Sequence, residues 1–376
     1  YGGEIIFTPG DIVYSSTKLL NLSQPKIDNY KLVNLMQRNK VTFDMLRETL
    51  RKIKNFKVHV IGDTIIDSYT RTNLIGGHIK TPTPSVSYQE KTDYIGGAGI
   101  VAKHLKSAGA NVYFTTILGN DSLKDFVLSE MNKSKIKINA IIDNTRPTTN
   151  KNTIISNGYK LLKIDKLDNH PISEQILNKI KNSIIKQKTD AVIFSDFRHG
   201  IFNKTSIPIL IYSIKKDVFK VADSQVATRW GNIGDFKNFD LLTPNEKEAR
   251  FSLADQDSSI SDLTRRLKEK TKWNNLILKL GERGIFACGK KYISGFSIPA
   301  FTSQVIDAVG AGDALLAYAT LSMLVTKSVF ISSILGSVAA ACECEHEGNV
   351  VIESEQIIRK LNSIQELSDY KISYKA

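Results

Sequence analysis

The sequence is poor in cysteine and has no long uninterrupted apolar stretch, and each shortage excludes a class of protein. Its three cysteines, Cys288, Cys342 and Cys344, are too few and too clustered for a disulfide framework, which indicates a reducing compartment such as the cytoplasm. The apolar runs fall short of the roughly 18–20 residues that span a bilayer, and no charged segment followed by an apolar one opens the chain. We therefore expect a soluble, cytoplasmic protein that does not enter a membrane.

Acidic residues are fewer than basic ones, with 38 Asp and Glu against 51 Lys and Arg, so the formal net charge is +13. Such an excess of positive charge can bind nucleic acid, an anionic surface or a phosphorylated small molecule. The lysines are spread over expected helix surfaces, as around residues 178–188. We interpret them as solvated helix faces and expect no nucleic-acid partner; a true nucleic-acid protein would retain DNA or RNA tightly and in a salt-sensitive way.

The sequence contains enough hydrophobic residues to form a large core. With 376 residues, 41% of them hydrophobic and 24% charged, the chain can bury a large interior, and its length suggests about two domains. The first residue is Tyr1 rather than methionine, which we interpret as a fragment or a processed product.

Short β-branched segments alternate with amphipathic ones along most of the chain. This rhythm predicts buried parallel strands joined by helices, hence a doubly wound α/β fold with helices on both faces of the sheet. Two segments, 79–95 and 150–168, depart from this strand–helix order, and apolar and polar residues alternate within each. They predict a small β-sheet lid over the carboxyl ends of the strands, where ligands bind in such folds. The expected strands are 56–63, 111–118, 190–196, 219–224, 239–245 and 275–281, and the expected helices are 97–108, 122–134, 172–187, 204–216, 246–254 and 259–271.

The segment VIDAVGAGDALLAYAT, residues 305–320, concentrates glycine and acid between two apolar runs. We expect a short strand at 301–306, a glycine turn and a helix that starts near Gly312. The unpaired backbone N–H groups and the dipole at such a helix start suit a bound anion. Asp313 is then either a base that deprotonates an attacking hydroxyl beside a phosphoryl group or an ordinary acid near a helix N-terminus.

The same segment also resembles a known signature. DAVGAGD is similar to the D-T-x-G-A-G-D motif of the ribokinase-like (PfkB) sugar kinases, and other segments match that family in the same order. The likeness covers about residues 56–365 and implies an ATP- and Mg²⁺-dependent sugar kinase, with a monovalent cation such as K⁺ as a further expected cofactor. The matching segments are VIGDTIIDSYT (60–70), IGGAGIVAKHLKSAGANV (95–112), LLTPNEKEA (241–249) and LILKLGERGIF (276–286).

The resemblance implies a role for each matching residue. Asp313 is the catalytic base, and the anion hole is formed by Gly310, Ala311 and Gly312. Asn245 and Glu248 hold Mg²⁺ through water. The residues implied to bind ATP or magnesium are Asn245, Glu248, Lys279, Gly281, Gly284, Asp307, Ser337 and Asn349, and those implied to bind the sugar are Asp63, Asp67, Gly96 and Gly97.

Within the family, the sequence looks most like the kinase half of the bifunctional enzymes that make ADP-heptose for bacterial surface polysaccharide. Such kinases phosphorylate the anomeric hydroxyl of a heptose 7-phosphate. Residues 1–21 resemble the end of the nucleotidyltransferase half, and 366–376 are expected to be a tail. Residues 22–55 are expected to be a helical linker, with Thr42 as a helix cap and one buried apolar stripe formed by Phe43, Leu46, Leu50 and Ile53. A homodimer formed through the lid strands 79–95 is expected because exposed sheet edges invite pairing.

Some positions depart from the family pattern. Ala308 stands where the motif has Thr, Ile100 where many relatives have Asn, Ser337 where Asn is common and Asn349 where Thr is common, and ADSQ (222–225) lacks a Pro-Lys pair. The cation that binds the phosphate of the sugar would then come from Arg71, Lys103, Arg198 or His199, each of which can equally be a surface charge.

Three alternatives to this assignment follow. CECEHEG (342–348) could suggest zinc, but Cys342, Cys344 and His346 do not converge on one helix face, so we expect a helix end and no zinc site. The chain could be a kinase of an unphosphorylated sugar or nucleoside. It could also be a module with the kinase fold but weakened catalytic activity, which binds sugar phosphates or acts as an oligomerisation platform for the transferase, because Ala308 and Ile100 both depart from the family pattern.

Overall fold

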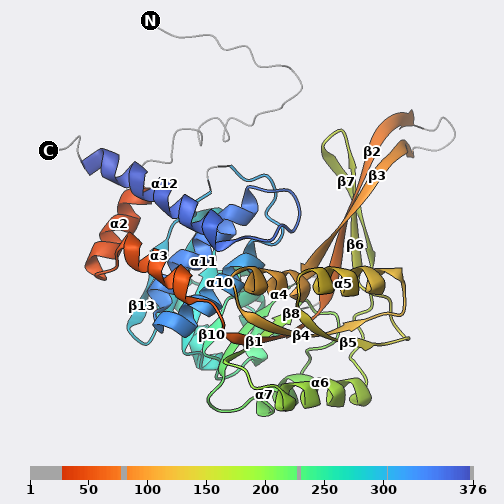
Figure 1. The fold of residues 1–376 in the computed structure, drawn as a ribbon, viewed down its shortest axis with the longest axis horizontal. Helices are drawn as coiled ribbons and strands as arrows, with labels where there is room; N and C mark the ends of the chain where they lie inside the picture. Colours follow the sequence, from red (N-terminus) through yellow and green to blue (C-terminus); the bar gives the residue numbers. More distant parts are fainter. Residues whose placement is uncertain (1–27, 78–82, 227–229, 303, 373–376) are drawn as a thin grey trace, which may run out of the picture.

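The structure is a computed structural model that describes residues 28–77, 83–226, 230–302 and 304–372. Residues 1–21, expected to resemble the end of a nucleotidyltransferase, lie outside the described residues. The described chain forms a large sheet with helices on both faces and a smaller sheet that stands up from it (Figure 1). The doubly wound α/β fold with a β-sheet lid is therefore confirmed.

The large sheet has nine strands in the described residues, in the order β13-β12-β11-β10-β9-β8-β1-β4-β5. All neighbours from β11 to β5 are parallel, whereas β12 and β13 are added as an antiparallel edge. The strands are β1 (Lys57–Gly62), β4 (Asn111–Leu118), β5 (Lys137–Ile142), β8 (Ala191–Asp196), β9 (Phe219–Ser224), β10 (Leu241–Leu242), β11 (Asn275–Lys279), β12 (Ile285–Gly289) and β13 (Tyr292–Ile298).

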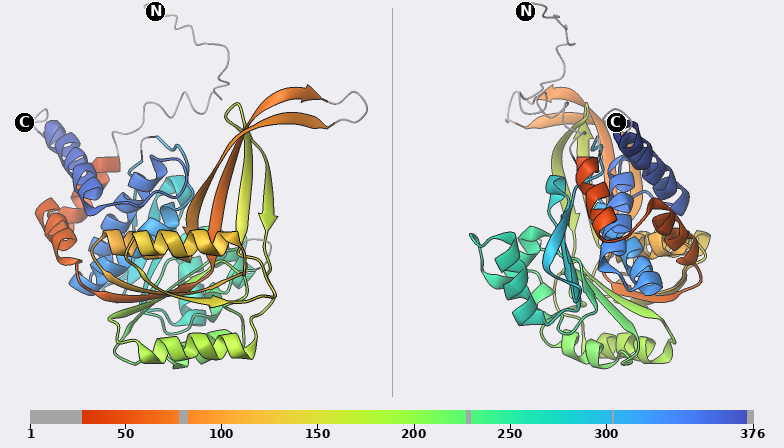
Figure 2. Two further views of the ribbon diagram at one scale, coloured as in Figure 1. Left: turned by 45° about the vertical axis from the view of Figure 1, so that its right-hand side comes forward. Right: turned by 90° about the vertical axis from the view of Figure 1, so that its left-hand side faces the viewer.

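Helices cover both faces of this sheet, and the alternation of side chains along each strand supplies both cores. In β8, Ala191 and Ile193 belong to one core, while Val192 and Phe194 belong to the other. The first core is closed by α4 (Ala98–Ser107), α5 (Ser122–Lys133), α10 (Ala311–Thr326), α11 (Val329–Cys344) and α12 (Ser354–Ile372). The second is closed by α6 (Glu174–Lys186), α7 (Ser206–Tyr212), α8 (Glu246–Leu253) and α9 (Ile260–Thr271), as the two views of Figure 2 show.

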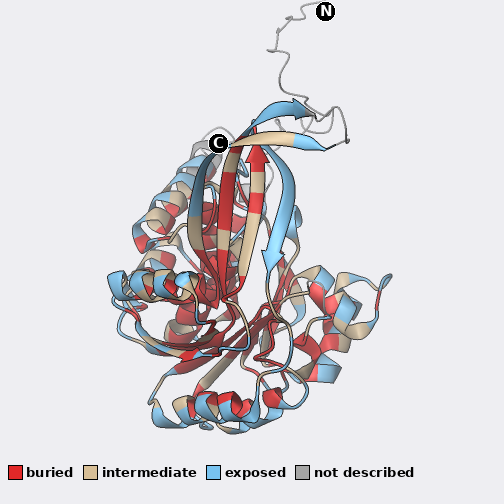
Figure 3. Ribbon diagram, turned by 90° about the vertical axis from the view of Figure 1, so that its right-hand side faces the viewer, coloured by how far each residue is buried: buried red, intermediate tan, exposed pale blue. Residues whose placement is uncertain are grey.

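The lid is a four-stranded sheet in the described residues, with the order β3-β2-β6-β7. Figure 3 shows this sheet rising above the main domain. Its strands are β2 (Thr64–Gly77), β3 (Pro84–Gly97), β6 (Asn150–Ser156) and β7 (Tyr159–Lys166). Strands were expected at 79–95 and 150–168 and are present there within the described residues, but β2 was not expected. The expected strand 56–63 is present as β1, whereas the residues that follow it belong to β2, because the chain leaves the main sheet at Gly62 and enters the lid at Thr64.

The segment 22–55 contains two helices in its described part, α2 (Asp28–Arg38) and α3 (Phe43–Lys52). Thr42 caps α3 as expected, because its hydroxyl accepts a hydrogen bond from Met45 N at 3.2 Å. Leu46, Leu50 and Ile53 are buried in the same core as α10 and α12. The stripe predicted from the sequence is confirmed, while the role of the segment as a linker stays a prediction.

One expected strand is wrong. Residues 301–302 and 304–306 are irregular, and the backbone N–H groups of Ile306 and Asp307 donate to Cys344 O at 2.8 and 3.3 Å. The end of α11, rather than a neighbouring strand, therefore accepts the backbone hydrogen bonds of this segment. Among the helices that the structure describes, none is both long and apolar enough to cross a membrane.

Candidate active site

The glycine turn lies at the N-terminus of α10, as the sequence predicted. Gly310 is the N-cap of this helix with φ +87°, and no side chain caps the helix, so its first N–H groups remain available. A Cβ on Gly310 would lie 2.6 Å from Asn349 Oδ1 and 2.7 Å from Glu343 Oε1. Both the backbone conformation and the space therefore require glycine, and the turn formed by residues 307–312 presents an anion-binding helix end.

Asp313 is buried in the first turn of α10. Burial raises the pKa of its carboxyl well above the usual value, Asp223 raises it further, and Lys279 opposes both. Lys279 Nζ lies 2.9 and 3.1 Å from the two oxygens of Asp223 and packs beside Gly312. Burial alone would lower the pKa of Lys279, but Asp223 and Glu248 outweigh burial and raise it, so this ammonium stays charged beside the turn.

Asn245 and Glu248 form a capping box at the start of α8. Asn245 N donates to Glu248 Oε2 at 2.6 Å, Asn245 Nδ2 donates to Oε1 at 2.5 Å, and Glu248 N donates to Asn245 Oδ1 at 2.8 Å. Burial raises the pKa of Glu248 to about 8, with Lys279 opposing and Asp223 adding to the rise. The pair therefore has a structural role in the helix and also places two oxygen-bearing groups close to Lys279.

Asp67 lies at the base of the lid, where Asn349 Nδ2 donates to its Oδ2 at 2.7 Å. Burial raises the pKa of this carboxyl despite that hydrogen bond. Each of the two expected glycines is required for a different reason. A Cβ on Gly96 would lie 2.1 Å from Asp67 Oδ2. Gly97 has φ +59°, and a Cβ added there would lie 2.4 Å from Asp63 O. Gly96 thus makes room for the Asp67 carboxylate that was expected to bind the sugar, and Gly97 makes room for the backbone carbonyl of Asp63.

A single cavity of about 630 Å³ joins these elements. It extends from the lid to the start of α10 and on between α10, α11 and the segment after β13. The Ser337 hydroxyl lines it and is buried without a hydrogen-bond partner in the described structure. Of the residues predicted from the sequence, the cavity is lined by Asp67, Gly97, Asn245, Lys279, Gly281, Gly284, Gly310, Ala311, Gly312, Asp313, Ser337 and Asn349.

Asp63 is not brought into this lining. Its Oδ2 accepts hydrogen bonds from Phe197 N at 3.0 Å and His199 N at 3.1 Å. Burial raises the pKa of Asp63 to about 6, and these two N–H groups oppose the rise. Asp63 therefore holds the loop after β8, one step away from the cavity.

The four cations expected to meet a sugar phosphate also lie elsewhere. Each has other partners and none is among the residues that line the cavity in the described structure. Arg71 pairs with Glu90 and Glu347, Lys103 pairs with Glu130 at 3.0 Å, Arg198 donates to Phe202 O at 3.1 Å, and His199 Nδ1 lies 2.7 Å from Asn169 Oδ1.

Two lysines that the sequence did not single out line the cavity instead. Lys151 on β6 and Lys163 on β7 lie on the lid, and Lys151 is directly opposite Asp67 in the β2–β6 register. Burial lowers the pKa of Lys151, and Lys163 lowers it further, so the two ammonium groups lie close enough to repel each other. Asp223 was also missed, although its place at the carboxyl end of β9 is the signal that would have found it.

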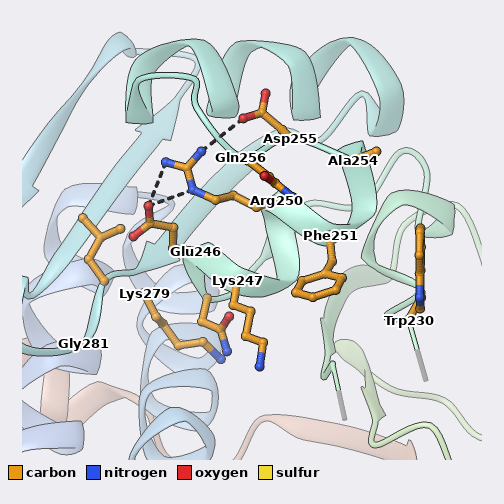
Figure 4. A pocket seen from close by; sticks show the side chains of 12 residues that line it. Trp230, Glu246, Lys247, Arg250, Phe251, Ala254, Asp255, Gln256, Lys279 and Gly281 are labelled. Atoms are coloured by element: carbon orange, nitrogen blue, oxygen red, sulfur yellow. Dashed lines mark hydrogen bonds and ion pairs between the residues drawn. The ribbon is translucent and has the colours of Figure 1, made fainter. Parts of the chain in front are cut away.

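A second cavity of about 700 Å³ adjoins the first and shares Asn245, Lys279 and Gly281 with it (Figure 4). Arg250 holds Glu246 and Asp255 on its upper side, while Lys247 and Lys279 extend toward its lower side. The open space around Gly281 thus continues along α8.

Comparison with known proteins agrees with this geometry. A profile of the pfkB family carbohydrate kinases matches residues 55–355. The bifunctional protein HldE of Sulfurimonas denitrificans is 26% identical over 334 residues, which covers 86% of this chain and 66% of that protein. HldE of Helicobacter hepaticus is 26% identical over 319 residues, covering 82% of this chain and 64% of that protein. The chain thus spans about two thirds of the length of these relatives.

Solved structures share the fold at low sequence identity. The tetrameric inhibited form of phosphofructokinase-2 from Escherichia coli superimposes with a TM-score of 0.68 at 14% identity and covers 82% of this chain and 99% of its own. Ribokinase of Arabidopsis thaliana, complexed with ribose and ATP, gives 0.65 at 16% identity with the same coverage of 82% and 99%. The fold is therefore that of the ribokinase-like sugar kinases.

Proposed function

Because the chain belongs to the pfkB family of carbohydrate kinases, a family of phosphotransferases acting on a sugar hydroxyl, we propose that it phosphorylates the C1 hydroxyl of a heptose 7-phosphate with ATP. The observation that carries this proposal is one cavity that contains Asp313 and the α10 N-terminus together with the lid lysines Lys151 and Lys163. One part of the cavity suits a transferred phosphoryl group, and the other suits a second anionic group on the acceptor.

The heptose assignment is supported by the relatives and by the lid. The HldE relatives match 81–86% of this chain. Lys151, which is half-buried, and the exposed Lys163 place two positive charges close together near the Asp67 carboxylate, and a bound anion would offset their mutual repulsion. A sugar that carries its own phosphate supplies that anion, whereas an unphosphorylated sugar does not.

Asp313 is suited to accept the proton of the attacking hydroxyl. Its buried carboxyl has a raised pKa, so its ionised form is a stronger base than an exposed aspartate, and Lys279 limits the rise. The amides of residues 310–312 face charge that develops on the transferred group, and Asp67 orients the acceptor from the lid side. ATP supplies the phosphoryl group and the leaving ADP oxygen when it is bound.

The residues fit Mg²⁺ held through water. The described residues contain no group of three or more His, Cys, Asp or Glu that could hold a metal ion directly. Mg²⁺ keeps several waters and commonly uses one or two protein oxygens together with substrate phosphates. Asn245 and Glu248, fixed by their capping box beside Lys279, would hold such waters, and the ion would neutralise charge on the phosphates.

A monovalent cation fits less well at the start of the turn. The Asp307 carboxylate already accepts from the Tyr69 hydroxyl at 2.5 Å and from Gly348 N at 3.3 Å, and Lys160 Nζ lies 3.5 Å from its other oxygen. These are donors and a positive charge rather than the oxygen ligands that a cation needs. The Asp307 carboxylate therefore does not offer K⁺ a site.

We also propose that the protein is a homodimer that uses its lid, through the edge strand β7 rather than through the opposite edge strand β3, which contains most of the residues 79–95 expected from the sequence. Strand β7 is an edge strand whose residues are all exposed, including a patch of large apolar side chains. Water-exposed apolar groups on an unpaired edge favour pairing with another strand, and a second copy of this chain offers the same edge. The patch consists of Tyr159, Leu161, Leu162 and Ile164.

The test is an assay of ADP release with Mg·ATP and a panel of sugars and sugar 7-, 6- and 5-phosphates, with the variant Asp313→Asn alongside. We expect turnover on the heptose 7-phosphate and a loss of about 10² to 10⁴ in kcat for the variant. The matched control is Asp125→Asn, which removes a carboxylate that is 71% exposed on α5. It should leave kcat unchanged.

Three results would contradict parts of the proposal. An Asp313→Asn variant with wild-type kcat would remove Asp313 as the base. Faster turnover on unphosphorylated sugars than on any sugar phosphate would show that the acceptor is an unphosphorylated sugar and not a heptose 7-phosphate. No turnover on any sugar, with ATP still bound, would favour the weakened kinase-like module and direct attention to Ala308 and Ile100.

A further inference from the structure

Every second side chain along the lower part of β2 contacts the main domain at the same place. Residues two apart on a strand project from one face, so these side chains form a row on the cavity side of the lid. The partners lie at the start of the glycine turn and in the loop between α11 and α12. The contacts are Asp67 with Asn349, Tyr69 with Asp307, and Arg71 with Glu347.

Tyr69 is the central member of this row and the most deeply placed contact. It is 4% exposed, its ring lies 5.6 Å from the ring of Tyr94, and its hydroxyl donates to Asp307 Oδ2 at 2.5 Å. Burial raises the pKa of Tyr69, and the neighbouring Asp307 raises it further, so the phenol keeps its proton and acts as a donor.

Asp307 is the first residue of the turn that ends at the N-cap of α10. Burial alone would raise its pKa, but the Tyr69 hydroxyl, the Lys160 ammonium and two backbone N–H groups outweigh burial and lower it. Hydrogen bonds to a charged acceptor are the stronger ones, and a buried carboxylate that loses a donor moves or takes up a proton. The position of Asp307 therefore depends on the lid residue Tyr69.

Few interactions between the residues of the turn restrain its conformation. Gly310 at its end has no side chain, and Ala308 offers only a methyl group directly after Asp307. Val309 N lies 3.4 Å from Asp307 Oδ1, a long hydrogen bond. Anchoring through the Asp307 side chain, together with the hydrogen bonds of Ile306 N and Asp307 N to Cys344 O, thus helps to fix where the amides of residues 310–312 point.

We infer that Tyr69 is a positioning residue for phosphoryl transfer, which holds the glycine turn through Asp307 and makes its geometry depend on the seated lid. This inference rests on the proposed kinase activity, because the turn is taken to face the transferred group. Displacement of preorganised donors by a fraction of an ångström weakens their effect in the transition state more than ground-state binding.

The experiment compares wild-type protein with Tyr69→Phe, which keeps the ring packed on Tyr94 and removes only the hydroxyl. We expect kcat to fall about tenfold or more while the KM for ATP stays within about twofold. The control is Tyr94→Phe, which removes a hydroxyl from the neighbouring, tilted ring and leaves the contact of Tyr69 with Asp307 in place. It should keep wild-type kcat.

A second readout does not need activity. Amide hydrogen exchange of the full chain, followed by peptide mass spectrometry, should show faster exchange in the peptide that covers residues 307–312 for Tyr69→Phe, and unchanged exchange in the strands of the main sheet. A general loss of stability would instead speed exchange throughout the domain, and no change in either kcat or exchange at the turn would overturn the inference.

The two readouts separate failure of this inference from failure of the proposed function. An active wild type with an unchanged Tyr69→Phe variant contradicts only the role of Tyr69. An inactive wild type whose turn still exchanges faster in the variant contradicts the kinase activity and leaves the anchoring of the turn supported.

Discussion

At the scale of single residues, Gly96 is a position where an added methyl group would directly meet the side chains of Asp67 and Asn349. An added Cβ would lie 2.1 Å from Asp67 Oδ2 and 2.9 Å from Asn349 Nδ2, so Gly96→Ala must displace the carboxylate that faces the acceptor. We expect the KM for the sugar to rise by about tenfold, equivalent to ~1.4 kcal/mol of binding. Overpacking of this kind should also lower the free energy of unfolding by about 1–3 kcal/mol. Steady-state kinetics and thermal unfolding of the variant measure both.

The matched control is Gly158→Ala at the turn between β6 and β7. There φ is +82°, so alanine strains the backbone, yet the new Cβ would meet nothing within 4 Å. Gly158→Ala should therefore lose stability without a change in sugar KM. Equal KM for Gly96→Ala and wild type would show that Asp67 does not contact the acceptor.

Residues of the glycine turn could be predicted from the sequence because their chemistry is local. Gly310 and Asp313 are three positions apart at one helix start, and a short motif fixes that geometry. The substrate cations could not be predicted in this way. Arg71 and Lys103 are as basic as Lys151, but only the pairing of β6 with β2 decides which lysine lies opposite Asp67.

At the scale of elements, the proposed function assigns the choice of acceptor to the inner face of the lid. Lys151 and Lys163 are in neighbouring strands on the face that carries Asp67, and both line the cavity. We expect Lys151→Gln and Lys163→Gln each to raise the KM for a sugar phosphate by about tenfold, because each removes a charge-assisted contact. The KM for the unphosphorylated analogue should not change, and kinetics on the two substrates measures the difference.

Lys166→Gln on the same strand is the control. Lys166 is exposed on β7 and pairs in register with Asn150, next to Lys151 in sequence, so its side chain lies on the opposite face of the lid. Its removal should leave the KM for both substrates unchanged. If the cavity lysine variants behave like Lys166→Gln, the phosphate of the acceptor is bound elsewhere.

The element boundaries that sequence reasoning missed are those set by distant contacts. The strand pattern of residues 60–70 is continuous, and nothing local shows that the chain passes from the main sheet to the lid at Asp63. The apolar residues 301–306 have strand-like composition, yet Cys344 O accepts the N–H groups of Ile306 and Asp307 and leaves the segment irregular. In both places tertiary pairing overrides local preference.

At the scale of the whole molecule, the segment before the first strand is part of the core. Leu32, Met36, Leu46, Leu50 and Ile53 are buried together with residues of α10 and α12. The amphipathic pattern predicted a buried stripe but not its partner, because a stripe is equally compatible with a partner domain or with the domain that follows. Only the packed structure shows that α2 and α3 close the same face as α12.

The oligomeric state provides the prediction at this scale. On β7, Leu162 and Ile164 are 53% and 51% exposed and lie on the face opposite Lys163. If two copies meet through this edge, charges placed there become unpaired in an interface that excludes water, at a cost that a weakly paired edge cannot offset. We expect wild-type protein to sediment as a dimer and the double variant Leu162→Glu, Ile164→Glu to sediment as a monomer.

The control for that measurement is Ile185→Glu on α6, which is 50% exposed and belongs to a helix on the far face of the main sheet. It adds a charge at an equally exposed apolar position and should leave the dimer intact. A monomeric wild type would contradict the lid interface directly. A dimer that survives the double variant but not Ile185→Glu would instead place the interface on the side of α6, and the row of contacts from β2 to the glycine turn would then have to hold the lid without help from a second copy.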